Sequence, residues 1–177
     1  WDFRGNLEFP KSHDGHRLCE PTVYRAKDGT IMMLLRDTHY SHRMYLSTLR
    51  DDGTWSPGVP TDIPDSPSLT DSLVLDDGTV LLIGNQMAPE FDNPGKGHYD
   101  RDPLMAAVSP DGKTFQKAYA LRCGGHRYRV SQSLVKGRGG GGQYPSATVH
   151  NGTLYVQYSM GKEEIWITAV PLAVVME

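Results

Sequence analysis

The sequence predicts an all-β fold built from repeated blades, a β-propeller, on three observations. A hairpin pattern occurs three times along the 177 residues, and a second strand-and-turn pattern follows the first two copies. Glycine (19) and proline (12) are abundant while only 38% of residues are hydrophobic, which suits short strands joined by turns. No stretch of useful length has helical periodicity. Four strands per unit, repeated unevenly at about 50 to 75 residues, are typical of propeller blades.

The first element of each unit is a hairpin around an Asp-Gly or Asn-Gly pair. The copies read EPTVYRAKDGTIMMLLR at residues 20–36, TDSLVLDDGTVLLIGNQ at residues 70–86 and YPSATVHNGTLYVQYS at residues 144–159. These dipeptides between two β-prone runs are the best short-range hairpin signals. We therefore expect tight turns at three glycines: Gly29, Gly78 and Gly152.

The second element is a strand followed by an Asp-Gly turn and an aromatic residue. It reads RMYLSTLRDDGTW at residues 43–55 and PLMAAVSPDGKTF at residues 103–115. After the third hairpin, IWITAVP at residues 165–171 supplies a strand with no turn behind it. Together the two elements predict four strands in each of the first two units.

The chain is predicted to hold about three blades of a single domain whose N-terminal blades are missing. Trp1 occupies the position that Trp55 and Phe115 hold after the later Asp-Gly turns. The uneven spacing comes from insertions at residues 87–99 and 120–143, which we interpret as long loops on one rim and which are often functional at such lengths. The blade units are expected at roughly residues 16–60, 66–120 and 143–175.

Charge and composition limit the classes of partner. A net charge of −3 and scattered Lys and Arg give no electrostatic reason to expect nucleic acid or an anionic membrane surface. No apolar run approaches the length that spans a bilayer. Two cysteines, Cys19 and Cys123, form one bridge or none.

Residues 109–115, SPDGKTF, resemble a shortened Asp-box, the S-x-D-x-G-x-x-W turn of sialidases and other BNR-repeat propellers, and residues 51–55 resemble a degenerate copy. In such a turn the Asp carboxylate accepts backbone N–H bonds, the glycine takes a positive φ and the aromatic ring packs between strands. The boxes lie far from the sugar site in that family. The resemblance therefore implies a fold, a six-bladed sialidase-like propeller of which this chain is the C-terminal half.

Four further residues follow the order of functional residues in sialidases. Glu20 before the first hairpin, Arg36 at the end of its inner strand, Arg101 before a later Asp-box strand and Tyr144 opening the last hairpin match in sequence. The resemblance implies that Tyr144 is the nucleophile, Glu20 its general base, and the two arginines the groups that hold the substrate carboxylate. It places a third arginine and an acid/base Asp upstream of Trp1.

The chemistry of a sialic acid explains these residue types. Its anomeric carbon carries a carboxylate that would repel a carboxylate nucleophile, so a neutral tyrosine activated by a glutamate is better suited. Arginine binds a carboxylate through charge-assisted, bidentate hydrogen bonds. We expect exo-acting hydrolysis of a terminal sialic acid or related acidic sugar on glycans, without metal or cofactor, in the extracellular or periplasmic location usual for the family. Three rim residues are added as predicted substrate contacts: Asn85, His39 and His98.

For single residues, purely structural roles stay open. Glu20 can be a strand-edge carboxylate, Arg101 a surface ion pair with its Asp neighbours, and Tyr144 a packing residue. Pro145 is expected to hold Tyr144 in extended geometry. The glycine tract at residues 137–142 lacks the Gly-Lys-Ser/Thr ending and following helix of a phosphate-binding loop.

Two other functions also stay open. Histidines near the predicted rim motivate a polysaccharide lyase or a hydrolase of another sugar acid, although their spacing matches no metal template. The shortened boxes and long insertions motivate a non-catalytic carbohydrate-binding or protein-docking propeller.

Overall fold

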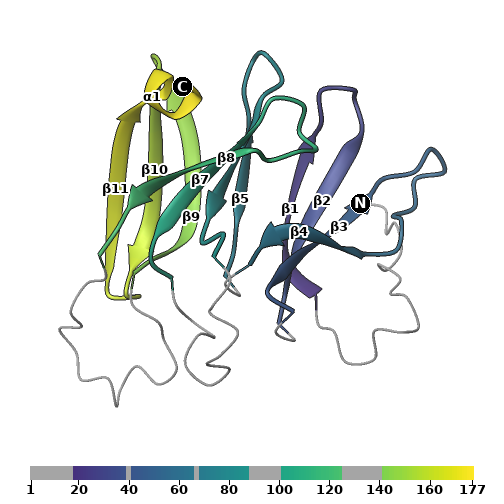
Figure 1. Ribbon diagram of the computed structural model, residues 1–177, viewed down its shortest axis with the longest axis horizontal. Coiled ribbons are helices and arrows are strands. Elements are labelled where there is room, and N and C mark those ends of the chain that lie inside the picture. The colour runs from purple at the N-terminus through teal and green to yellow at the C-terminus, as the bar shows by residue number, and fades with distance from the viewer. Residues whose placement is uncertain (1–17, 39–40, 66–67, 88–100, 125–140) are drawn as a thin grey trace.

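Three antiparallel sheets follow one another along the chain in the computed structural model, which describes residues 18–38, 41–65, 68–87, 101–124 and 141–177 (Figure 1). The all-β prediction is confirmed, and the sheets are three blades of a propeller. The first sheet holds four strands in sequence order, β1 (Leu18–Arg25), β2 (Ile31–Asp37), β3 (Arg43–Thr48) and β4 (Val59–Pro64).

The second and third sheets repeat this arrangement. The second holds β5 (Asp71–Val74), β6 (Val80–Gly84), β7 (Leu104–Ser109) and β8 (Lys117–Arg122). The third holds β9 (Gly142–His150), β10 (Thr153–Met160) and β11 (Glu164–Pro171). A short helix that the sequence did not predict, α1 (Leu172–Met176), follows β11.

The first two strands of each sheet form the predicted hairpins. Gly29, Gly78 and Gly152 have φ values of +90°, +85° and +72°, which an L-residue with a Cβ rarely adopts. In the first two turns an Asp side chain accepts a backbone N–H two residues on, from Thr30 at 3.0 Å and from Thr79 at 2.9 Å. The three tight turns expected from the sequence are therefore present.

The turn after β7 is built around the carboxylate of Asp111. Its Oδ1 accepts hydrogen bonds from the backbone N–H groups of Thr114 (2.9 Å) and Lys113 (2.7 Å) and from the Ser109 hydroxyl (2.8 Å). These bonds favour the charged form and lower the pKa of Asp111 to about 2. Phe115 at the end of the turn packs against the core between the first two sheets, as an aromatic residue in this position was expected to do.

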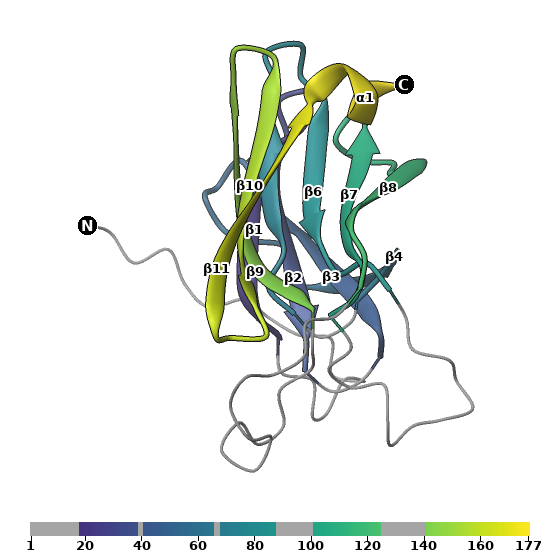
Figure 2. The same ribbon diagram turned by 90° about the vertical axis from the view of Figure 1, so that its left-hand side faces the viewer.

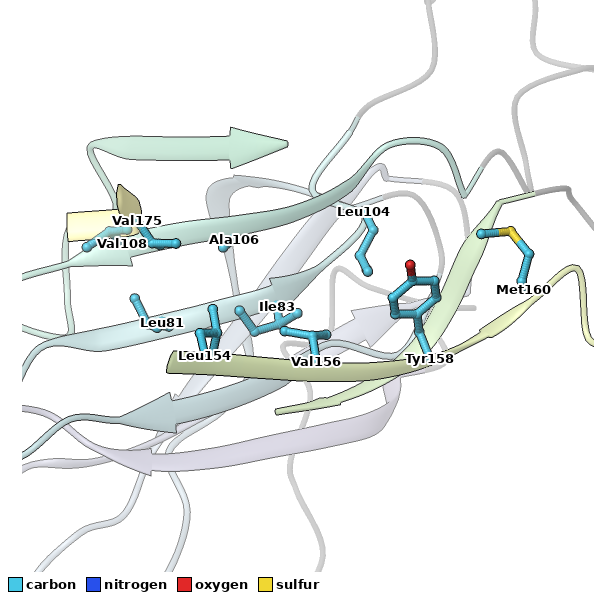
Figure 3. Close-up of a cluster of buried hydrophobic side chains, with 10 residues drawn as sticks. All are labelled: Leu81, Ile83, Leu104, Ala106, Val108, Leu154, Val156, Tyr158, Met160 and Val175. Carbon is cyan, nitrogen blue, oxygen red and sulfur yellow. The ribbon is translucent and has the colours of Figure 1, made fainter. Parts of the chain in front are cut away.

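The sheets pack face to face, and the middle sheet is covered on both faces. Leu81 and Ile83 on β6 point into a core shared with the third sheet (Figure 3). Val80 and Leu82 point the other way, into a core shared with the first sheet. All four side chains are fully buried. A strand buried on both faces reads as a continuous apolar run, which explains the sequence VLLIG at residues 80–84.

The first strands of the three sheets lie next to one another. The Thr22 and Ser72 hydroxyls are 2.6 Å apart between β1 and β5, and the Ala147 N–H donates to Asp71 Oδ2 at 2.8 Å between β9 and β5. Figure 2 shows the third sheet in front of the second. The hairpin turns of the three sheets lie together at one end (Figure 1). The first strand of each sheet therefore starts, and its second strand ends, at the opposite edge.

The second insertion is shorter than the sequence suggested. It was expected to begin at residue 120, but β8 continues to Arg122, and β9 begins at Gly142. The predicted bounds made this loop too long at each end, because the polar and glycine-rich residues there still pair with β7 and β10. Residues 88–100 and 125–140 lie outside the described part of the chain.

Val156→Ala tests the shared core of the second and third sheets. Val156 is fully buried on β10, so we expect its truncation to lower the free energy of unfolding by about 2 kcal/mol through lost burial and a cavity. The matched control is Val59→Ala on β4, where the side chain is 48% exposed and the loss should stay below about 0.5 kcal/mol. Denaturant titration measures both, and equal effects would contradict the assignment of this core.

Candidate functional site

Four residues predicted from the sequence meet at the edge opposite the hairpin turns. Glu20 lies near the start of β1, Arg36 near the end of β2, Arg101 just before β7 and Tyr144 near the start of β9. Arg36 Nη1 is 2.6 Å from Glu20 Oε2, and the Tyr144 hydroxyl donates to Glu20 Oε1 at 3.5 Å. The Arg101 guanidinium lies 5.1 Å from the centroid of the Tyr144 ring. We call these four residues the charged tetrad.

Glu20 and Tyr144 are both presented by an irregular strand backbone. Their φ values are +48° and +54°, and the strand register shifts beside each of them. Such bulges re-aim a side chain and occur beside active sites. Each residue is followed by a proline, which has no N–H to lose from the ladder at a bulge.

The expectation that Pro145 keeps Tyr144 extended is therefore wrong. Tyr144 is in the left-handed region, and the contacts of β9 with β10 and with the second sheet hold it there. The consequence is that the Tyr144 side chain, 36% exposed, reaches across to the first sheet rather than following the alternation of β9.

Positive charge is in excess around the Tyr144 ring. Burial alone would lower the pKa of Arg36, but its hydrogen bond and ion pair with Glu20 outweigh burial and raise it. Burial lowers the pKa of Arg101, and the nearby charge of Arg36 acts in the same direction. Lys162 Nζ lies 5.1 Å from the same ring centroid. Three cations and one carboxylate thus surround one phenol, an arrangement suited to an anion.

Sequence reasoning missed Lys162. It sits in the turn between β10 and β11, with a φ of +61°. The sequence did hold a clue to Lys162. The turn that follows the second strand of a blade lies at the same edge of the sheets as Arg36. A basic residue in that turn, after the hairpin that Tyr144 opens, could have been placed near the tyrosine.

Arg101 is held in place by a neutral side chain and by a backbone contact. Its Nη1 donates to the Gln143 side-chain oxygen, and its backbone pairs with Gly141 in an isolated parallel bridge. Gly141 must be glycine here, since a Cβ would lie 2.3 Å from the Arg101 carbonyl oxygen. Arg101 is 3% exposed, which rules out the solvent-exposed ion pair considered from the sequence.

Asn85, predicted to contact substrate, is buried beneath Arg101. Its amide nitrogen lies 2.9 Å from the carbonyl oxygens of both Arg101 and Pro103 and 3.1 Å from that of Gly142. It therefore ties the start of β7 to the start of β9 and positions Arg101 beside Tyr144. Direct substrate contact by Asn85 stays a prediction.

The other predicted contacts, His39 and His98, lie outside the described residues. Within the part that the structure describes, no group of three or more His, Cys, Asp or Glu is arranged to hold a metal ion. No described helix is long and apolar enough to cross a membrane. Cys19 and Cys123 are not bridged to each other.

Asp65 is a buried carboxyl group beside Arg36 that sequence reasoning did not single out. It is 3% exposed, and its Oδ2 accepts the Asp37 N–H at 3.2 Å. Burial raises the pKa of Asp65 to about 7, although that hydrogen bond, the charge of Arg36 and the Ser68 N–H oppose the shift. The buried Asp37 carboxylate acts in the same direction as burial.

Comparisons with known proteins agree with this architecture. The family model of the BNR repeat-like domain matches residues 5–156. A protein of unknown function from Dyadobacter fermentans DSM 18053 superposes with a TM-score of 0.59 at 17% identity, over 88% of this chain and 38% of that one. A xylan β-1,4-xylosidase from Bacillus halodurans C-125 superposes with a TM-score of 0.51 at 16% identity, over 89% and 28%.

At these identities the two solved structures show a shared fold and nothing about substrate. This chain spans well under half the length of either. No curated protein matches the chain.

Asp65→Asn tests the buried carboxyl group through the pH dependence of stability. Because the folded pKa exceeds the unfolded one, the wild-type chain should lose stability as pH rises from about 4 through 7, by roughly 3 kcal/mol. Asparagine resembles the protonated acid, so the variant should be more stable than wild type at pH 8 and similar at pH 4. Urea unfolding at both pH values measures this.

The matched control is Asp62→Asn at an exposed position of β4, which should leave the pH profile of stability unchanged. A profile that is identical for Asp65→Asn and wild type would show that Asp65 ionises normally.

Proposed function

We propose that this chain, which belongs to the BNR repeat-like domain family, carries part of the sugar site of an exo-acting glycosidase for a terminal sialic acid or related acidic sugar. The observation that carries the proposal is the charged tetrad. A phenol hydroxyl points at a carboxylate oxygen 3.5 Å away, with two arginines around them, and the residues come from three different blades.

In this proposal Tyr144 is the nucleophile. Its hydroxyl oxygen attacks the anomeric carbon while Glu20 Oε1 takes the proton, and the bond to the departing glycan oxygen breaks. The product is a covalent glycosyl-tyrosine, which water then hydrolyses with return of the proton to the phenol oxygen. A separate acid must protonate the departing oxygen, and we place that acid on blades outside this chain, as the family resemblance implies.

Arg36 and Arg101 would hold the carboxylate on the anomeric carbon. Arg36 uses Nη1 for Glu20 and leaves other N–H groups for a ligand. Arg101 is fixed by Gln143 and by its backbone contacts, so it needs little reordering on binding. Lys162 adds long-range attraction for the anion. The substrates would be glycans outside the cytoplasm.

A second candidate is a carbohydrate-binding propeller without turnover. The observation in its favour is the 2.6 Å ion pair between Arg36 and Glu20, because it already occupies one oxygen of the carboxylate that would have to take the proton. The 3.5 Å separation of the Tyr144 hydroxyl from Glu20 is also long for a hydrogen bond between oxygens. No described residue favours the lyase alternative.

Tyr144→Phe in the complete protein that contains this chain tests the enzyme proposal. Removing the hydroxyl removes the nucleophile, so we expect hydrolysis of a fluorogenic aryl sialoside to fall by at least about 100-fold in kcat, with a smaller change in KM. Release of the fluorophore gives the rate directly.

The control is Tyr155→Phe, a tyrosine of similar exposure on β10, which should leave kcat unchanged. Sialoside binding without turnover by the wild-type protein would favour the binding propeller. Full turnover by Tyr144→Phe would overturn the role of Tyr144.

A further inference from the structure

The middle blade contributes further side chains near the charged tetrad. Thr22 on β1 contacts Ser72 on β5 at 2.6 Å, so Glu20 and Thr70, each two positions earlier, lie toward the same edge of these neighbouring strands. Asp71 likewise contacts Ala147 on β9, three residues after Tyr144. The segment that leads into β5 and the end of β6 therefore lie at the edge of the sheets where Glu20 and Tyr144 meet.

The side chains on this segment and on the end of β6 are polar, uncharged and buried. Ser68 is 1% exposed, Thr70 is 5% exposed and Gln86 is 8% exposed. Among the described residues, the Ser68 hydroxyl and both amide atoms of Gln86 have no hydrogen-bond partner. Buried polar atoms without a partner are rare in native proteins, so a ligand or ordered water is expected to satisfy these.

Gly84 provides the space that the Thr70 and Gln86 side chains share. A Cβ at Gly84 would lie 2.6 Å from Thr70 Oγ1 and 2.7 Å from Gln86 Nε2. Both side chains therefore turn into the volume that any larger residue would fill. The sequence places glycine at the last position of a strand that is otherwise Val-Leu-Leu-Ile, where packing alone would favour another apolar residue.

We propose that Gln86, Ser68 and Thr70 form a subsite that binds hydroxyl groups of the sugar whose carboxylate the arginines hold. A sugar hydroxyl both donates and accepts, and the Gln86 amide offers one group of each kind. The subsite carries no charge, so it recognises the neutral part of the sugar while the tetrad recognises the anionic part. This inference rests on the proposed function for the acidic sugar.

Calorimetric titration of the complete protein with N-acetylneuraminic acid and its monodeoxy analogues tests the subsite. Gln86→Met keeps the side-chain volume and removes both hydrogen-bonding groups. We expect it to raise the Kd by about tenfold, as loss of a buried hydrogen-bond pair would. One deoxy analogue should bind wild type about tenfold more weakly, and lose nothing further in Gln86→Met, because the partner of that hydroxyl is already gone.

Two further variants separate binding from folding. Gln116→Met is the matched control at an exposed glutamine and should bind as wild type does. Ser68→Ala removes one unpaired hydroxyl with little change of shape, and should weaken binding without lowering the unfolding temperature.

The outcomes separate the two proposals. Unchanged affinity in Gln86→Met and Ser68→Ala, with tight binding of the acidic sugar, would overturn the subsite and leave the proposed function standing. If the wild type binds a neutral sugar but no acidic one, and Gln86→Met loses that binding, the subsite stands and the acidic-sugar proposal falls. No binding of either class would overturn both.

Discussion

Face-to-face packing of the second blade against its two neighbours is the constraint on which the site depends. β6 is buried on both faces, so the first and third sheets are held at fixed positions on either side of it. The contacts Thr22–Ser72 and Asp71–Ala147 then set the relative heights of the first strands. Only because of this alignment does Tyr144 face Glu20, 124 positions earlier in the chain.

Local distortion of the backbone also positions the site residues. A regular strand would alternate its side chains between the two faces of the blade, whereas the left-handed φ values at Glu20 and Tyr144 turn both side chains toward the shared edge. Buried polar contacts then hold the arginine partner. Asn85 and Gln143 fix Arg101, so its desolvation is offset by hydrogen bonds and by the neighbouring ring rather than by a surface counter-ion.

Much of this architecture was readable from local chemistry. The Asp-Gly and Asn-Gly pairs predicted the three hairpin turns, and the Ser-Pro-Asp-Gly segment predicted the carboxylate-centred turn at Asp111. Arg36 at the end of the first hairpin's inner strand was matched to the family pattern together with Glu20, and the two side chains form an ion pair. Prediction was poorer where a side chain's setting depends on another blade. The contacts by which Asn85 ties Arg101 to the third blade were not foreseen, and Asp65 and Lys162 were not singled out.

The sequence by itself determined the fold class, the strands and the turn positions, because these follow from hairpin dipeptides, β-prone runs and turn carboxylates within a few residues of one another. The order Glu20, Arg36, Arg101, Tyr144 was readable too, through its resemblance to a family. Tertiary structure alone decided that these four residues meet, which blade faces carry the cores, and that Tyr144 leaves extended geometry before Pro145. The physical reason is that burial and ion pairing between blades depend on packing across long sequence separations, which local patterns do not encode.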